Sequence, residues 1–111
     1  MEKENSLGQV RIADEVIEII AELALNDISG IYSTAKTKGR KNQAKSIEVK
    51  VVDGQVTADI EVFVSMNVKI PVVAEKVQNK VKAAIENMTG LQVSEVNVRI
   101  VGLIKEDAPE E

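Results

Sequence analysis

The chain contains no cysteine, no histidine and no tryptophan. The lack of cysteine excludes disulfide bonds and thiol nucleophiles, and the lack of histidine excludes imidazole acid–base catalysis. Together these absences exclude the common zinc sites, which use thiolate and imidazole ligands. Tyr32 and Phe63 are the only aromatic residues, so the sequence lacks the stacking platforms on which most single-strand nucleic-acid binders depend.

The length and composition indicate one soluble domain. The chain has 111 residues, of which 44% are hydrophobic and 29% are charged, typical of a single globular domain. No stretch approaches the roughly 20 apolar residues of a membrane-spanning helix, and the polar, acidic first residues do not resemble a signal peptide. We therefore expect a cytoplasmic protein with a flexible N-terminus (1–7), one domain (8–103) and an acidic tail (104–111).

Hydrophobic periodicity and turn residues divide the domain into strands and helices. The expected strands cover residues 9–12, 31–32, 47–52, 55–64 and 95–101, and the expected helices cover residues 14–25 and 71–88. The order β-α-β-β-β-α-β predicts an α+β two-layer sandwich, with two helices on one face of a mixed sheet. A weak internal similarity suggests two βαβ-like halves, in which the strand at residues 9–12 would belong to the same sheet.

The clearest local signal is a β-hairpin around Asp53-Gly54. Two alternating runs flank this dipeptide, and an Asp-Gly pair favours a two-residue type I′ turn because both turn positions need positive φ. This turn fixes the register, with Val51 opposite Val56, Val49 opposite Ala58 and Ile47 opposite Ile60. These residues then form one apolar face of the sheet, and the other face is polar.

The first helix is apolar over more of its surface than one core-facing stripe requires. Val16, Ile20, Leu23 and Ala24 are expected to face the core, and further apolar residues widen this face. The width indicates that the helix contacts the sheet and also a second helix or another subunit. The candidate interface residues are Ile17, Ile19 and Leu25.

A basic segment interrupts an otherwise acidic chain of net charge −4. Five of the fourteen basic residues lie within ten positions, and these are Lys36, Lys38, Arg40, Lys41 and Lys45. Gly39 and Asn42 and the lack of apolar residues predict a loop. The loop either contacts an anion or the acidic surface of a partner, or is simply a solvated loop.

The sequence offers few groups that could perform catalysis. Asp14, Glu18 and Glu22 are spaced four apart, which permits an acid–base pair or a metal site but is typical of the solvated face of a helix. No glycine-rich phosphate loop is present, and the motifs of the common RNA-binding modules are absent. We therefore expect no enzyme activity, no cofactor, no metal and no specific nucleic-acid partner.

Several segments, taken in order, resemble the alkaline shock protein (Gls-type) family of envelope stress response proteins from Gram-positive bacteria. They comprise residues 8–17, the hairpin at 53–57, residues 68–77, residues 87–93 and residues 96–98. The similarity covers residues 7–103. At Met66-Asn67 the chain departs from the aromatic-glycine pair that family members often have before the second helix.

The resemblance implies a non-enzymatic cytoplasmic protein that supports cell-envelope homeostasis. Better-known members self-associate and are held at the membrane by a separate integral-membrane protein, so the resemblance implies a homo-oligomer with such a partner. Shorter members have looser assignments, and some are tied to fatty-acid metabolism. The alternative is therefore a regulatory adaptor that binds a metabolic enzyme, with the basic loop contacting an acidic surface.

Overall fold

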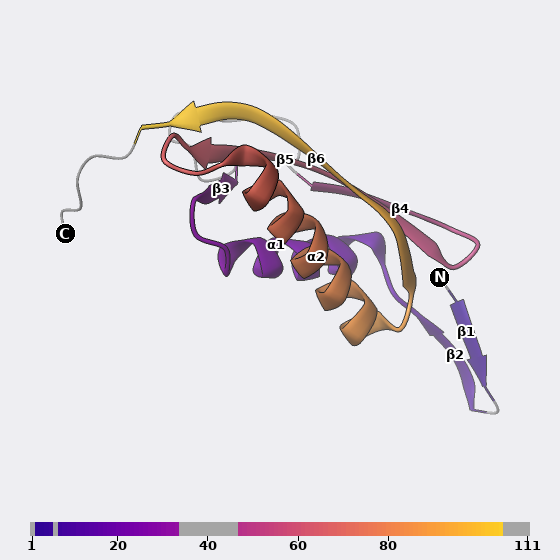
Figure 1. Cartoon of the computed structure of the whole chain (residues 1–111). Helices are drawn as coiled ribbons and strands as arrows, with labels where there is room; N and C mark the ends of the chain where they lie inside the picture. The colour runs from indigo at the N-terminus through magenta and orange to yellow at the C-terminus, as the bar shows by residue number, and fades with distance from the viewer. Residues whose placement is uncertain (1, 6, 34–46, 106–111) are drawn as a thin grey trace.

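A computed structural model describes residues 2–5, 7–33 and 47–105 (Figure 1). Two helices, α1 (Asp14–Asn26) and α2 (Ile70–Thr89), lie side by side against one face of a β-sheet. The other face of the sheet carries no helix in the described part of the chain. The predicted α+β sandwich is confirmed.

The sheet is built around one long strand, β5 (Gln55–Ser65). Along one edge of β5 run two antiparallel strands, β3 (Ile31–Ser33) and β4 (Ile47–Val52). Along its other edge runs β6 (Gln92–Ile104), which is parallel to β5 and is reached through α2. The sheet is therefore mixed, as predicted.

The hairpin between β4 and β5 has the predicted register. Ile47 pairs with Ile60, Val49 with Ala58, and Val51 with Val56. The turn residues Asp53 and Gly54 have φ values of 53° and 78°, which are the positive angles that a type I′ turn requires at both positions.

The basic segment falls between two strands that share one edge of β5. β3 ends at Ser33, opposite Val62, and β4 begins at Ile47, opposite Ile60. Residues 34–46 therefore leave and rejoin the sheet at neighbouring positions on the same edge. The five basic candidate residues lie outside the described residues, and so does the predicted acidic tail beyond Lys105.

The core lies between the sheet and the two helices. The inward positions of β5 are Val56, Ala58, Ile60, Val62 and Val64, and all five are almost completely buried. The helix α2 contributes one residue per turn to this core, namely Val73, Val77, Val81 and Ile85. Pro71 falls in the first turn of α2, where its missing N–H would have no helical partner.

The first strand does not join the main sheet. Gly8–Arg11 forms β2, which pairs with β1 (Glu2–Asn5) in a separate two-stranded sheet. The expectation of two βαβ-like halves in one sheet is therefore wrong. All four residues of β2 are exposed, and only Val10 among them is a large apolar residue, so this strand has no face to bury.

The orientation of α1 differs from the prediction in a way that matters for function. Ile17 is 0% exposed and Leu25 is 3% exposed, so both face the core and neither is available to a partner protein. Ile19 is 56% exposed and is the one predicted interface residue at the surface. Val16 and Leu23, which were expected in the core, are also exposed.

No helix among the described residues is both long enough and apolar enough to cross a membrane.

The turn geometry predicts the effect of replacing Gly54. A branched L-residue at positive φ is strained, so Gly54→Val should lower the free energy of unfolding by about 1–2 kcal/mol. Asp53→Asn is the matched control, since Asn-Gly favours the same turn, and its effect should stay within about 0.5 kcal/mol. Urea unfolding measures both, and equal losses in the two variants would contradict the type I′ turn.

The orientation of α1 is tested by two substitutions of the same kind. Ile17→Ala creates a cavity in the core and should cost about 2–5 kcal/mol of unfolding free energy. Ile19→Ala removes exposed atoms and should change it by less than about 0.5 kcal/mol. Thermal or urea unfolding distinguishes them, and similar costs at both positions would refute this orientation.

Candidate interaction surface

The outward face of α1 carries a row of aliphatic side chains. Val16, Ile19 and Leu23 are spaced three and four residues apart, which places them on one face of the helix. They are 46%, 56% and 58% exposed. We call these three residues the α1 stripe.

Acidic residues lie beside the α1 stripe. Glu15 and Glu22 are exposed on the same helix, and helical geometry places both next to Ile19. The neighbouring side of α1 is filled by Ile17, Ile20, Ala21 and Ala24, which pack in the core. The α1 stripe is therefore surplus to the packing of this domain, and an acidic border runs along it.

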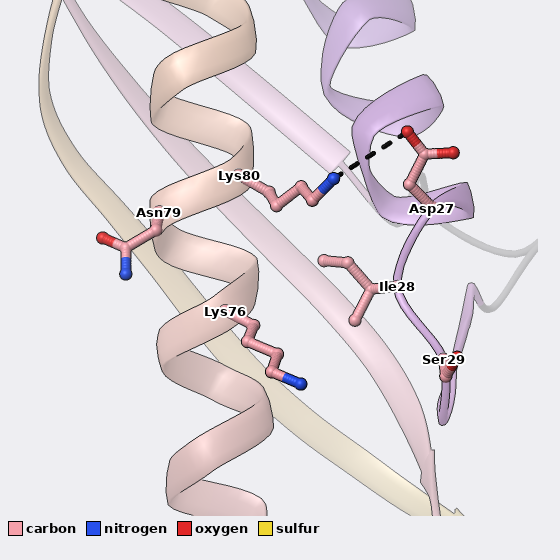
Figure 2. Close-up of a pocket in the computed structure, with 6 residues that line it drawn as sticks. All are labelled: Asp27, Ile28, Ser29, Lys76, Asn79 and Lys80. Atoms are coloured by element: carbon pink, nitrogen blue, oxygen red, sulfur yellow. Dashed lines mark ion pairs between the residues drawn. The ribbon is translucent and has the colours of Figure 1, made fainter.

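A cleft of about 400 Å³ separates the end of α1 from α2 (Figure 2). It is lined by Asp27, Ile28, Ser29, Lys76, Asn79 and Lys80. The last turn of α1 contains no basic residue, although the C-terminus of a helix favours positive charge. Lys80 of α2 supplies that charge from the neighbouring helix, and its Nζ lies 4.0 Å from Asp27 Oδ2. Both side chains are more than half exposed, so this pair contributes little to stability.

The face of the sheet opposite the helices carries a polar network. Asn97 on β6 donates a hydrogen bond of 2.9 Å to Asp59 on β5, and Arg99 lies 3.7 Å from Glu61. Glu48 on β4 is directly opposite Asp59, and like charges at such positions are unfavourable. The hydrogen bond from Asn97 compensates for this repulsion, because it stabilises the carboxylate of Asp59 from the β6 side.

The two aromatic residues meet on this polar face, a feature that the sequence interpretation missed. Tyr32 on β3 is the direct cross-strand partner of Phe63 on β5. The ring of Phe63 also covers Gly102 on β6, where an added Cβ would lie 2.6 Å from Phe63 Cε2. Glycine leaves room for this ring, and a larger residue at position 102 would require the ring of Phe63 to shift.

The described residues include no cluster of three or more acidic residues that could hold a metal ion. The carboxylates of α1 lie on its outer surface, and on the sheet Asp59 pairs with Asn97 and Glu61 with Arg99.

Comparison with known proteins identifies relatives along nearly the whole chain. YqhY of Bacillus subtilis, a protein described as uncharacterized, is 35% identical over 109 residues, which cover 91% of this chain and 81% of YqhY. Spy1535 of Streptococcus pyogenes, also described as uncharacterized, is 30% identical, with 93% and 84% covered. A Streptococcus pyogenes stress response regulator, a gls24 homolog, is 28% identical over 86% of this chain and 59% of its own length.

The family model agrees with these relatives. The model of the alkaline shock protein 23 family, described as having a cell envelope-related function, matches residues 2–105. The matched range includes the β1–β2 pair, both helices and all strands of the main sheet. The chain therefore belongs to the alkaline shock protein 23 family.

Proposed function

We propose that this protein acts without catalysis in the response of the cell envelope to stress, by binding partner proteins and other copies of itself. The family has a cell envelope-related function, and several relatives are stress response regulators by name. The lack of cysteine and histidine supports a role in binding over a role in catalysis.

The observation that carries the proposal is the α1 stripe. Its three aliphatic side chains are about half exposed although α1 already buries another face in the core. Burying each of them against a partner would contribute about 1 kcal/mol. Exposed apolar patches with polar borders mark sites of protein–protein interaction.

The border of the α1 stripe indicates the chemistry of its partner. Glu15 and Glu22 lie beside the aliphatic side chains, so a complementary surface would present aliphatic residues next to lysine or arginine. The partner is therefore expected to be a protein with an apolar patch and a basic border, in keeping with recruitment of this chain by another protein.

Ile19→Lys tests the role of the α1 stripe. It places a positive charge where the partner is expected to be apolar and basic, and should weaken partner binding at least about tenfold. Val52→Lys is the matched control, because Val52 is an aliphatic residue on β4 that is at least as exposed as Ile19. Partners are isolated from membrane and soluble fractions of the native host, and their affinities for each variant are then measured.

The same variants link binding to function. In the native host, loss of this protein should increase sensitivity to envelope stress, and the wild type and Val52→Lys should restore resistance while Ile19→Lys should not. Equal partner binding and equal complementation by all three proteins would refute the role of the α1 stripe. Absence of any stress phenotype would refute the envelope role itself.

A further inference from the structure

One edge of the sheet is long and unbroken. The edge formed by β3 and β4 consists of two short strands of three and six residues. On the opposite edge, β6 runs through thirteen residues and, among the described strands, pairs only with β5. Such an edge presents a row of backbone groups to which another strand can bind, and proteins usually cover it.

Side chains of α2 cover the first half of this edge. Glu86 Oε2 accepts a hydrogen bond of 3.0 Å from the N–H of Val93, and Gln78 Nε2 donates one of 3.1 Å to the carbonyl of Val96. The backbone groups of Val96 therefore point away from β5. Because these directions alternate along a strand, the backbone groups of Val98 and Ile100 also point away from β5.

The second half of the edge has no such cover among the described residues. Opposite Val62 and Phe63, an irregularity in β6 shifts by one residue the alternation of backbone groups that point toward and away from β5. The carbonyl of Ile104 accepts a hydrogen bond from Met66, so it points toward the β5 side and the backbone of Leu103 points outward. The side chain of Leu103 is 55% exposed. We call Val98–Ile104 the open segment.

The position of α2 excludes one possible occupant of the open segment. If two copies paired β6 with β6, these strands would lie about 4.8 Å apart. The helix α2 packs on β6 and reaches its outer edge through Gln78 and Glu86. The two α2 helices would then be closer than the about 8–10 Å that packed helices need. The occupant must therefore be an extended segment that carries no helix on that side.

The β1–β2 pair is such a segment within this chain. Among the described strands, β1 and β2 pair only with each other. Leu7 is 95% exposed and Val10 is 53% exposed, and an isolated two-stranded hairpin is marginally stable in water. A further neighbour would therefore stabilise it.

The β1–β2 pair is far from the open segment of its own chain. It extends away from the sheet beside the N-terminal end of α1, whereas β6 ends at the opposite end of the molecule (Figure 1). The molecule is accordingly elongated, with a longest dimension of 57 Å. The β1–β2 pair and the open segment of one chain are therefore too far apart to contact each other, so a contact between them joins two different copies.

We infer that the β1–β2 pair of one copy binds, as an added strand, to the open segment of another copy. Backbone hydrogen bonds would join the two chains, and Leu7 and Val10 would shield Leu103 and Val101 from water. This inference rests on the self-association in the proposed function, and it names the two surfaces that form the contact. The α1 stripe remains free for a different protein in this arrangement.

Single cysteines test the contact directly, because the natural chain has none. Val10→Cys and Leu103→Cys proteins are mixed and treated with a short bismaleimide, which should yield a cross-linked pair that contains one chain of each kind. The control mixture replaces Leu103→Cys by Val52→Cys, which is exposed at the other edge of the sheet, and should yield little product. A second test mixture, of Val10→Cys with Ile19→Cys, shows whether the β1–β2 pair instead contacts the α1 stripe of another copy.

Leu103→Pro tests the backbone contribution. Proline removes an N–H that points outward and leaves the bonds to β5 in place, and proline is tolerated at such edge positions. The dissociation constant for self-association should rise about tenfold. Leu103→Thr keeps the N–H and should change the constant much less. Analytical ultracentrifugation measures the constants, and circular dichroism confirms that both variants are folded.

The outcomes separate this inference from the proposed function. Self-association that is insensitive to Leu103→Pro and that cross-links through position 19 overturns the inference and leaves the proposed function standing. A chain that stays monomeric at every concentration overturns both the inference and the self-association, while partner binding through the α1 stripe is judged by Ile19→Lys. The inference is also overturned if the chain is a monomer and Leu103→Pro abolishes its binding of another protein. The open segment then binds that protein and not a second copy.

Discussion

The fold depends on the pairing of β5 along both of its edges. All eleven residues of this strand pair with β6 on one side, and nine of them pair with β3 or β4 on the other. The alternation of the strand turns its five aliphatic core residues toward the helices, and turns Phe63 and most of its polar residues away from them. Because Val56 and Ile60 are buried in the middle of this arrangement, a shift of register by one residue would expose the whole apolar set to water.

The basic segment, the outer edge of β6 and the α1 stripe all lie outside this central pairing. On one edge of β5, β3 ends opposite Val62 and β4 begins opposite Ile60, and the basic segment comes between them in the sequence. Among the described strands, β6 pairs only with β5. Gln78 and Glu86 bind the first half of its outer edge, and the open segment faces solvent. The helix α1 likewise contacts the core through one side, and the α1 stripe lies outside it. Among the described residues, a small domain with a complete core thus retains two surfaces that its own packing leaves exposed.

Local sequence signals predicted the elements whose geometry depends on neighbouring residues alone. Asp53-Gly54 fixed the turn and hence the register of β4 and β5. Gly90 ends α2 with a left-handed conformation, which is the usual role of glycine after a helix. The pairing of Tyr32 with Phe63, and the contact of Phe63 with Gly102, could not be predicted in this way. Both depend on which strands become neighbours across long separations in sequence.

The sequence by itself determined the α+β class, the order of the elements, the hairpin register and the surplus of apolar residues on α1. Only the tertiary structure decided which of those residues face the core, because α1 is apolar over a wide arc and either Ile17 or Val16 could have faced inward. The packing of α1 against both α2 and the sheet selects Ile17, Ile20 and Leu25. It leaves the α1 stripe in water, just as β2 stays outside the sheet because it has no apolar face to bury.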